Sequence, residues 1–246
     1  QILCGKNATG TLLDFSDIIG QIIPEIKPTI GFEQKNKHHI YDVYTHTAVS
    51  VGSIDPDPTL RLTMLFHDIG KPAVYHYENG QGHFHGHPEV SAEIARTVLN
   101  RLRCDNETKD TVLTLIREHD NRFPPDKKSV GRMLCKIGEK NYSLLMKVKK
   151  ADTAAQSDCM KDEKYAQINA LVKTAERIKE EKGCFSLSQL AINGNDLLSF
   201  LSGREIGQAL HDCLSRVIDE ELPNEKNTLL SFVRKKYSGE KQDEKP

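Results

Sequence analysis

The nine residues "MLFHDIGKP", Met64–Pro72, decide how this sequence is interpreted. An apolar run leads into His67 and Asp68, and Lys71 follows three residues later. An ionised carboxylate is costly to bury unless a counter-charge or a metal ion accompanies it. The stretch therefore predicts an apolar helix that ends in a polar site, where something binds the Asp68 carboxylate.

The bulk composition is that of a globular protein. The chain has 246 residues, of which 37% are hydrophobic and 28% charged, with a net charge of −1. No apolar run is long enough for a transmembrane helix, and the first ten residues do not have the pattern of a signal peptide. The six cysteines are widely spaced and form no CxxC motif. We therefore expect a reduced, cytoplasmic protein with no membrane partner.

Helical periodicity dominates the chain. Apolar residues recur at helical spacing in residues 90–102, 108–119 and 204–222, whereas period-two alternation is rare. A hairpin with Asn79-Gly80 as its turn is expected within residues 73–87. Helix caps are expected at Ser186–Gln189, and at Asn195 or Asp196. The predicted fold is all-α, a helical bundle followed by a smaller helical tail region.

Several imidazoles and carboxylates fall on the apolar faces of separate predicted helices. In helical bundles, metal sites are built from side chains of this kind on facing helices. A single histidine on an apolar face is more often a hydrogen-bonded core residue, so it is the ordered series that favours ligands. The candidate metal ligands are His46, His67, Asp68, His87, His119 and Asp152.

This series resembles the HD superfamily of metal-dependent phosphohydrolases. The minimal pattern of that superfamily is H…HD…D, which His46, His67-Asp68 and Asp152 match, and "HDIGK" is close to the strongest form of the motif. Two-metal members have two further histidines, and His87 and His119 stand in matching places.

The resemblance implies one or two divalent cations and hydrolysis of phosphate mono- or cyclic diesters, or of a nucleotide. Imidazole with carboxylate suits Mn, Fe, Ni, Co or Zn, and Mg is the choice of sites richer in carboxylate. Asp68 would bridge two ions and act in catalysis, because a bound cation generates hydroxide near neutral pH. Lys71 would contact a phosphate oxygen. Its alternative interpretation is an ordinary solvated lysine.

A second resemblance covers nearly the whole chain. Segments such as "GFEQKNKHHIYDVYTHT", "LRLTMLFHDIGKP", "KKADTAAQ" and "LAINGNDLL" are similar to the neck and body of bacterial tRNA nucleotidyltransferases, the CCA-adding or poly(A)-polymerase-like family. It implies a neck-like helical segment at residues 1–36, an HD domain at 37–160 and a helical body or tail at 161–246.

The nucleotide-adding head of that family is not apparent in this sequence. "GSIDPDP", Gly52–Pro58, contains a Gly-Ser pair and an Asp-x-Asp, but they are adjacent and include two prolines. Proline is poorly tolerated in a central strand, so we expect a turn here and no nucleotide addition by this chain alone.

A basic segment supports a different function. Residues 117–150 contain ten Lys or Arg and four Asp or Glu. Lys127, Lys128 and Lys136 are candidate contacts to tRNA phosphates, although a solvated helix face is the commoner explanation of such a run. Two hypotheses follow: an HD phosphohydrolase, or a non-catalytic tRNA-binding body of a CCA-adding or poly(A)-polymerase-like enzyme.

Overall fold

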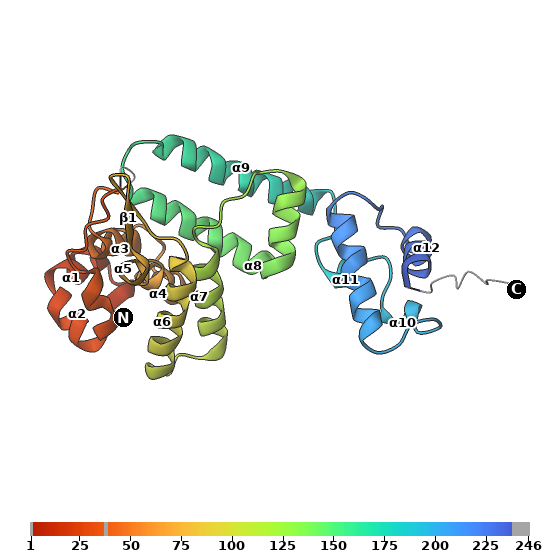
Figure 1. Cartoon of the computed structure of the whole chain (residues 1–246), viewed down its shortest axis with the longest axis horizontal. Coiled ribbons are helices and arrows are strands. Elements are labelled where there is room, and N and C mark those ends of the chain that lie inside the picture. Colours follow the sequence, from red (N-terminus) through yellow and green to blue (C-terminus); the bar gives the residue numbers. More distant parts are fainter. Residues whose placement is uncertain (1, 37–38, 238–246) are drawn as a thin grey trace, which may run out of the picture. The chain divides into compact units, whose positions relative to one another are not determined.

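The computed structural model describes residues 2–36 and 39–237, and helices dominate this part of the chain (Figure 1). The predicted all-α class is confirmed. The helices, with η marking the 3₁₀ turns, are η1 (Ile2–Cys4), α1 (Ala8–Asp14), α2 (Ser16–Ile22), η2 (Pro24–Thr29), α3 (Val43–Gly52), α4 (Pro58–Phe66), α5 (Lys71–Val74), α6 (His87–Arg101), α7 (Asn106–Glu118), α8 (Lys127–Ala154), α9 (Lys161–Glu180), η3 (Leu187–Gln189), α10 (Gly194–Leu197), α11 (Arg204–Ile218) and α12 (Lys226–Tyr237).

The described part also contains one antiparallel hairpin, formed by β1 (His76–Glu78) and β2 (Gln81–His83). Asn79 and Gly80 both have positive φ, +50° and +79°. Two such residues form the tight turn that matches the twist of the paired strands. The predicted hairpin and its turn are confirmed.

Aspartates begin three of the helices that form the candidate site. The carboxylates of Asp42, Asp57 and Asp105 accept hydrogen bonds from backbone N–H groups in the first turns of α3, α4 and α7. These first-turn N–H groups have no partner within the helix, so a cap of this kind defines where the helix starts. Asp57 lies within "GSIDPDP", which forms the connection between α3 and α4, as predicted.

Two of the predicted caps are wrong in detail. Ser186 precedes only the 3₁₀ turn η3, and its hydroxyl bonds the Gln189 side chain instead of a backbone N–H. The cap of α10 is Asn193, and Asp196 completes a capping box as the third helical residue. After Ser186 the chain forms only the three-residue turn η3, which is too short to be an α-helix. At the second predicted cap, Asn193 is the residue with the extended backbone that a cap requires.

Packing divides the chain into two compact units. One extends to Arg122 and includes Lys140–Ala170, and the other includes Phe123–Glu139 and the chain from Leu171. The backbone of α8 breaks from helical geometry at Gly138, with φ +77° and ψ 160°, values that glycine adopts most readily. The division into residues 1–36, 37–160 and 161–246 was drawn from resemblance and remains a prediction.

The first unit contains the helices on which the candidate site is built. Within it α4 packs against α3, α6 and α7. Its fully buried side chains include Phe66, Met64, Leu99, Ile116 and Leu145. This apolar core fixes the ends of α4 and α7, where the polar residues begin.

The second unit has a core of its own in α10, α11 and α12. Its buried members include Leu197, Ala209, Leu214, Leu229 and Val233. Cys213 lies in this core, and all six cysteines, which lie in the described part of the chain, are free. No helix between residues 2 and 237 is both long and apolar enough to span a membrane.

Arg61 connects the start of the chain to α4. Its side chain is buried, and its guanidinium donates to the backbone carbonyls of Leu3, Gly5, Ile54 and Asp55. A buried carbonyl that loses its hydrogen-bond donor is left with a desolvation cost that no other bond offsets, and this destabilises the folded state.

We therefore expect Arg61→Leu to lower the free energy of unfolding of the first unit by about 2–4 kcal/mol. The matched control is Arg96→Leu in the same unit, because Arg96 forms an exposed ion pair with Glu93. That pair should contribute less than about 1 kcal/mol. Urea unfolding followed by circular dichroism measures both changes. Equal stability of the two variants would contradict the role given to Arg61.

Candidate metal centre

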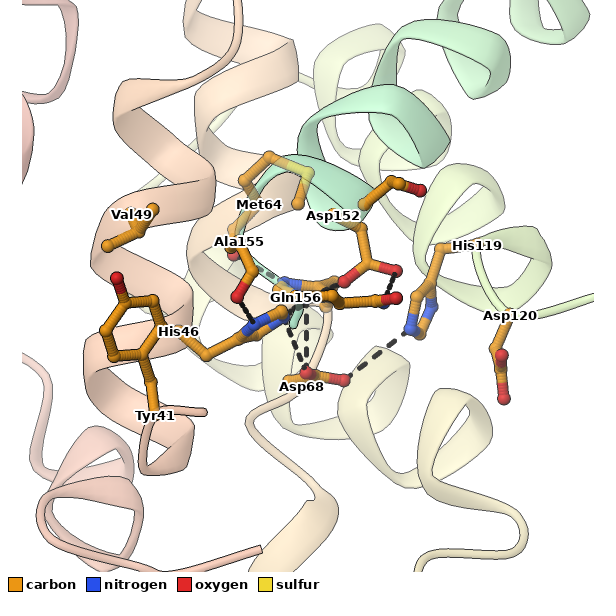
Figure 2. Close-up of polar contacts among 12 residues, drawn as sticks. Tyr41, His46, Val49, Met64, Asp68, His119, Asp120, Asp152, Ala155 and Gln156 are labelled. Atoms are coloured by element: carbon orange, nitrogen blue, oxygen red, sulfur yellow. Dashed lines mark hydrogen bonds and ion pairs between the residues drawn. The ribbon is translucent and has the colours of Figure 1, made fainter. Parts of the chain in front are cut away.

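The six predicted ligands converge in the first unit, although they come from five separate segments. Figure 2 labels four of them, His46, Asp68, His119 and Asp152. His46 lies in α3, His67 and Asp68 follow α4 directly, and His87 is the first residue of α6. His119 follows the last residue of α7, and Asp152 lies in the last turn of α8. The list of candidate ligands was predicted from helical spacing together with the resemblance to the HD superfamily, and the structure places all of its members together.

Backbone carbonyls orient the four imidazoles. Each Nδ1 atom lies close to one carbonyl oxygen. The distance is 3.3 Å from His46 to Ala155 and 2.7 Å from His67 to Met64. It is 2.9 Å from His87 to Phe84 and 2.6 Å from His119 to Ile116. A carbonyl oxygen only accepts, so each Nδ1 carries the hydrogen. The Nε2 atom of each neutral ring then has a free lone pair that can bind a metal ion.

These Nε2 atoms face one another in two pairs. The Nε2 atoms of His46 and His67 are 3.3 Å apart, and those of His87 and His119 are 3.2 Å apart. Two neutral imidazoles with Nδ1–H would direct lone pairs at each other across each gap. A positive species in each gap, either a proton or a metal ion, removes this repulsion.

Carboxylate oxygens complete both groups. Asp152 Oδ1 is 3.0 Å from His46 Nε2, and Asp68 Oδ2 is 3.2 Å from His67 Nε2. The other oxygen of Asp68, Oδ1, is 3.2 Å from His87 Nε2 and 3.6 Å from His119 Nε2. Asp68 therefore bridges the two pairs of histidines. Ligand atoms that bind one ion at about 2.1 Å lie roughly 3.0–3.4 Å from one another. The separations of 3.0 and 3.2 Å fall in this range, and the 3.6 Å between His119 and Asp68 is slightly longer.

Burial makes the charges of the centre interdependent. His46, His67, Asp68, His87 and His119 are each at most 5% exposed. Burial opposes protonation of His67, but Asp68 and Asp152 outweigh it and raise its pKa to about 10. Burial also opposes ionisation of Asp68 and Asp152, yet the neighbouring imidazoles, and Lys71 for Asp68, hold both carboxyl pKa values well below the usual range. For His119, burial lowers the pKa.

Lys71 is part of the centre and is not a solvated lysine. Its side chain is 4% exposed, and its Nζ lies 2.7 Å from Asp68 Oδ2 and 2.8 Å from Gln34 Oε1. Gln34 lies 34 residues before Asp68, so no local spacing in the sequence could have identified it. The ammonium offsets the Asp68 charge in the interior of the unit.

Gln156 is a second contact that was not predicted. It donates from Nε2 to Asp152 Oδ2 at 2.8 Å. It follows Asp152 by four residues, a spacing at which glutamine and aspartate side chains can bond in a helix, although Gln156 itself lies in the turn that follows the end of α8. That spacing is a signal by which Gln156 could have been found.

The predicted RNA-binding lysines belong to the second unit, whereas the ligand cluster belongs to the first. Lys127 Nζ is 3.0 Å from Glu181 and 3.1 Å from Glu220, and Lys128 Nζ is 3.5 Å from Asp219. Lys136 is exposed. The carboxylates offset much of the positive charge that the sequence of this segment displays.

Comparison with known proteins identifies tRNA nucleotidyltransferases among the relatives of this chain. Residues 86–233 match the family model for tRNA nucleotidyltransferase domain 2. A CC-adding tRNA nucleotidyltransferase of Thermus thermophilus is 37% identical over 128 residues, 49% of this chain and 29% of its own length. An A-adding tRNA nucleotidyltransferase of Deinococcus radiodurans is 28% identical over 50% of this chain and 30% of its own length. The aligned part of this chain therefore spans less than a third of either relative.

The predicted phosphohydrolase activity is wrong. The matching family and the relatives named above are tRNA nucleotidyltransferases, and none of these is a phosphohydrolase. The catalytic roles of Asp68 and Lys71 and the phosphate-ester substrate depended on that activity, so they are withdrawn with it. What remains for these two residues is the contact between them, a buried carboxylate and its counter-charge.

The resemblance to the body of tRNA nucleotidyltransferases is confirmed. The family match includes His87, His119 and Asp152 of the cluster, and continues through the core of the second unit to Val233. It covers more than half of the chain. The chain therefore belongs to the family of tRNA nucleotidyltransferase domain 2.

Proposed function

We propose that this chain is the tRNA-binding body of a protein related to the CCA-adding enzymes. The observation that carries the proposal is the family match over residues 86–233. The named relatives add CC or A to tRNA, and a binding body would hold that same substrate. Nucleotide addition is not part of the proposal.

The charges of the second unit support a choice of the side chains that would contact tRNA phosphates. Lys127 and Lys128 would have to leave carboxylates before they reach a phosphate. Arg234 and Lys235, in the last turn of α12, are exposed and pair with no carboxylate of residues 2–36 and 39–237. The Arg234 guanidinium stacks 5.4 Å from the centre of the Phe200 ring, which leaves its edge available. We infer that the α12 pair contributes more to tRNA binding than the Lys127–Lys128 pair.

The expected result concerns the salt dependence of tRNA binding. Each lysine or arginine that contacts a phosphate contributes nearly one unit to the log–log slope of affinity against salt. Arg234→Gln with Lys235→Gln should weaken tRNA binding and flatten that slope by roughly 2 units if both contact duplex phosphates. Fluorescence anisotropy with labelled tRNA at several salt concentrations measures both effects.

The matched control is the double variant Lys127→Gln and Lys128→Gln, which removes the same charge from the same unit. It should change the slope by less than half as much, because the ion pairs with Glu181, Glu220 and Asp219 already offset these ammonium groups. A larger effect of the control than of the α12 variant would favour the lysines predicted from the sequence. No effect of either would remove the charge-based support for tRNA binding.

We also propose that the six-residue cluster binds one or two divalent cations. The supporting observation is the pair of short Nε2–Nε2 separations, 3.3 and 3.2 Å, between rings whose hydrogens face carbonyl oxygens. A shared proton joins only two atoms, whereas each gap is also approached by a carboxylate oxygen. Converging donors in this number fit a metal ion better than a proton.

The residues divide into two subsites with Asp68 between them. His46, His67 and Asp152 with Asp68 Oδ2 would hold one cation, and His87 and His119 with Asp68 Oδ1 would hold the other. Imidazole and carboxylate donors together suit Mn, Fe, Co, Ni or Zn. A bound cation would supply positive charge that offsets the two buried carboxylates and joins the segments that carry the ligands.

Substitution of one ligand should remove one subsite. His87→Ala should lower the metal content by about one equivalent and leave the other subsite, because His87 contacts only Asp68 and His119 of the six ligands. Elemental analysis after dialysis against Mn²⁺, with thermal unfolding as a check of folding, measures the change.

An exposed histidine of the second unit provides the control, because His211→Ala should leave metal content unchanged. Two outcomes would contradict the assignment. One is a wild-type chain that retains no metal after dialysis, and the other is a His87→Ala chain that retains as much as the wild type.

A further inference from the structure

The two oxygens of Asp152 have different partners (Figure 2). Oδ1 faces the candidate subsite, 3.0 Å from His46 Nε2 and 3.8 Å from His67 Nε2. Oδ2 accepts a hydrogen bond of 2.8 Å from Gln156 Nε2. The side chain of Asp152 is 21% exposed, so packing alone does not fix its rotation.

Lys164 determines which end of the Gln156 amide faces Asp152. Its Nζ donates to Gln156 Oε1. An ammonium has donors only, so the amide oxygen must face Lys164 and the NH₂ group must face Asp152. With the opposite orientation, the amide oxygen would face the carboxylate and the NH₂ group would face the ammonium, and both contacts would be repulsive.

The same turn of the chain positions a second ligand. After α8 ends, Ala155 N and Gln156 N donate to the carbonyls of Asp152 and Thr153 in a tight turn. Within this turn the carbonyl oxygen of Ala155 is 3.3 Å from His46 Nδ1. The end of α8 thus provides one ligand, the partner that orients another ligand, and the amide that restrains the first.

We propose that Gln156, with its orientation fixed by Lys164, is a positioning residue that restricts Asp152 to a one-oxygen ligand of the subsite formed with His46 and His67. This rests on the proposed divalent-cation site. Without the amide, the carboxylate is free to rotate or to pair directly with Lys164, and either change removes Oδ1 from the subsite. The His87–His119 subsite has no contact with Gln156 or Lys164 among the residues that the structure describes.

The test is titration of the metal-free chain with Mn²⁺ by isothermal calorimetry, which counts equivalents and gives an affinity for each. Loss of a partner that orients a metal ligand typically lowers affinity 10- to 100-fold. Gln156→Leu should therefore weaken one of two equivalents by about that factor and leave the other unchanged. Lys164→Met should weaken the same equivalent. Lys164→Arg keeps donors toward Oε1, so it should bind both equivalents with wild-type affinity.

Gln189→Leu is the matched control, because Gln189 also accepts hydrogen bonds through its side chain but lies in the second unit. It should leave both equivalents unchanged. The melting temperature of each metal-free variant is recorded as well, because a merely structural role for Gln156 would lower it without selecting one equivalent.

The outcomes separate this inference from the proposal on which it rests. If the wild type binds no Mn²⁺, the cation site and the positioning role both fail. If the wild type binds two equivalents and Gln156→Leu binds them with unchanged affinity, only the positioning role is overturned. The positioning role is also overturned if Gln156→Leu weakens both equivalents equally, or if Lys164→Arg binds as weakly as Lys164→Met.

Discussion

The buried carboxylate of Asp68 is the group on which the arrangement of the first unit depends. It is 1% exposed and lies between two pairs of imidazoles, with the Lys71 ammonium 2.7 Å from Oδ2. A buried charge that loses its partners costs several kcal/mol, so the surrounding groups are constrained to remain. They come from different parts of the chain, and the fold must bring them together.

The ends of helices make this convergence possible. The last carbonyls of a helix have no N–H partner within it. His67 donates from Nδ1 to Met64 O in the last turn of α4, and His119 donates in the same way to Ile116 O in the last turn of α7. Each histidine thereby supplies a side-chain donor to a carbonyl at the end of its helix, and the Ile116 carbonyl also accepts the backbone N–H of His119. The side-chain bond directs the Nε2 atom toward Asp68. One local interaction thus completes the helix and orients the ligand.

Much of the fold could be predicted from the sequence, because it depends on local spacing, and the candidate ligands were predicted from the order of histidines and aspartates along the chain and from the HD resemblance. Apolar periodicity located α6, α7 and α11, and Asn79-Gly80 located the hairpin. The break in α8 at Gly138 was not predicted, because a glycine within a helical pattern does not reveal its own φ. Gln34 could not be predicted either, since only the folded chain brings it to Lys71. The hydrolase activity was inferred from a motif that specifies donors and not a reaction, and the family match corrected it.

The central claim is that this cluster binds divalent cations on both sides of Asp68. Anomalous X-ray diffraction from crystals of the chain soaked in Mn²⁺ tests it most directly, because the peaks locate the ions without any assumption about activity. The account predicts one peak among His46, His67 and Asp152 and a second beside His87 and His119, with Asp68 between them. Crystals that show no anomalous peak within the cluster at saturating Mn²⁺ would contradict it.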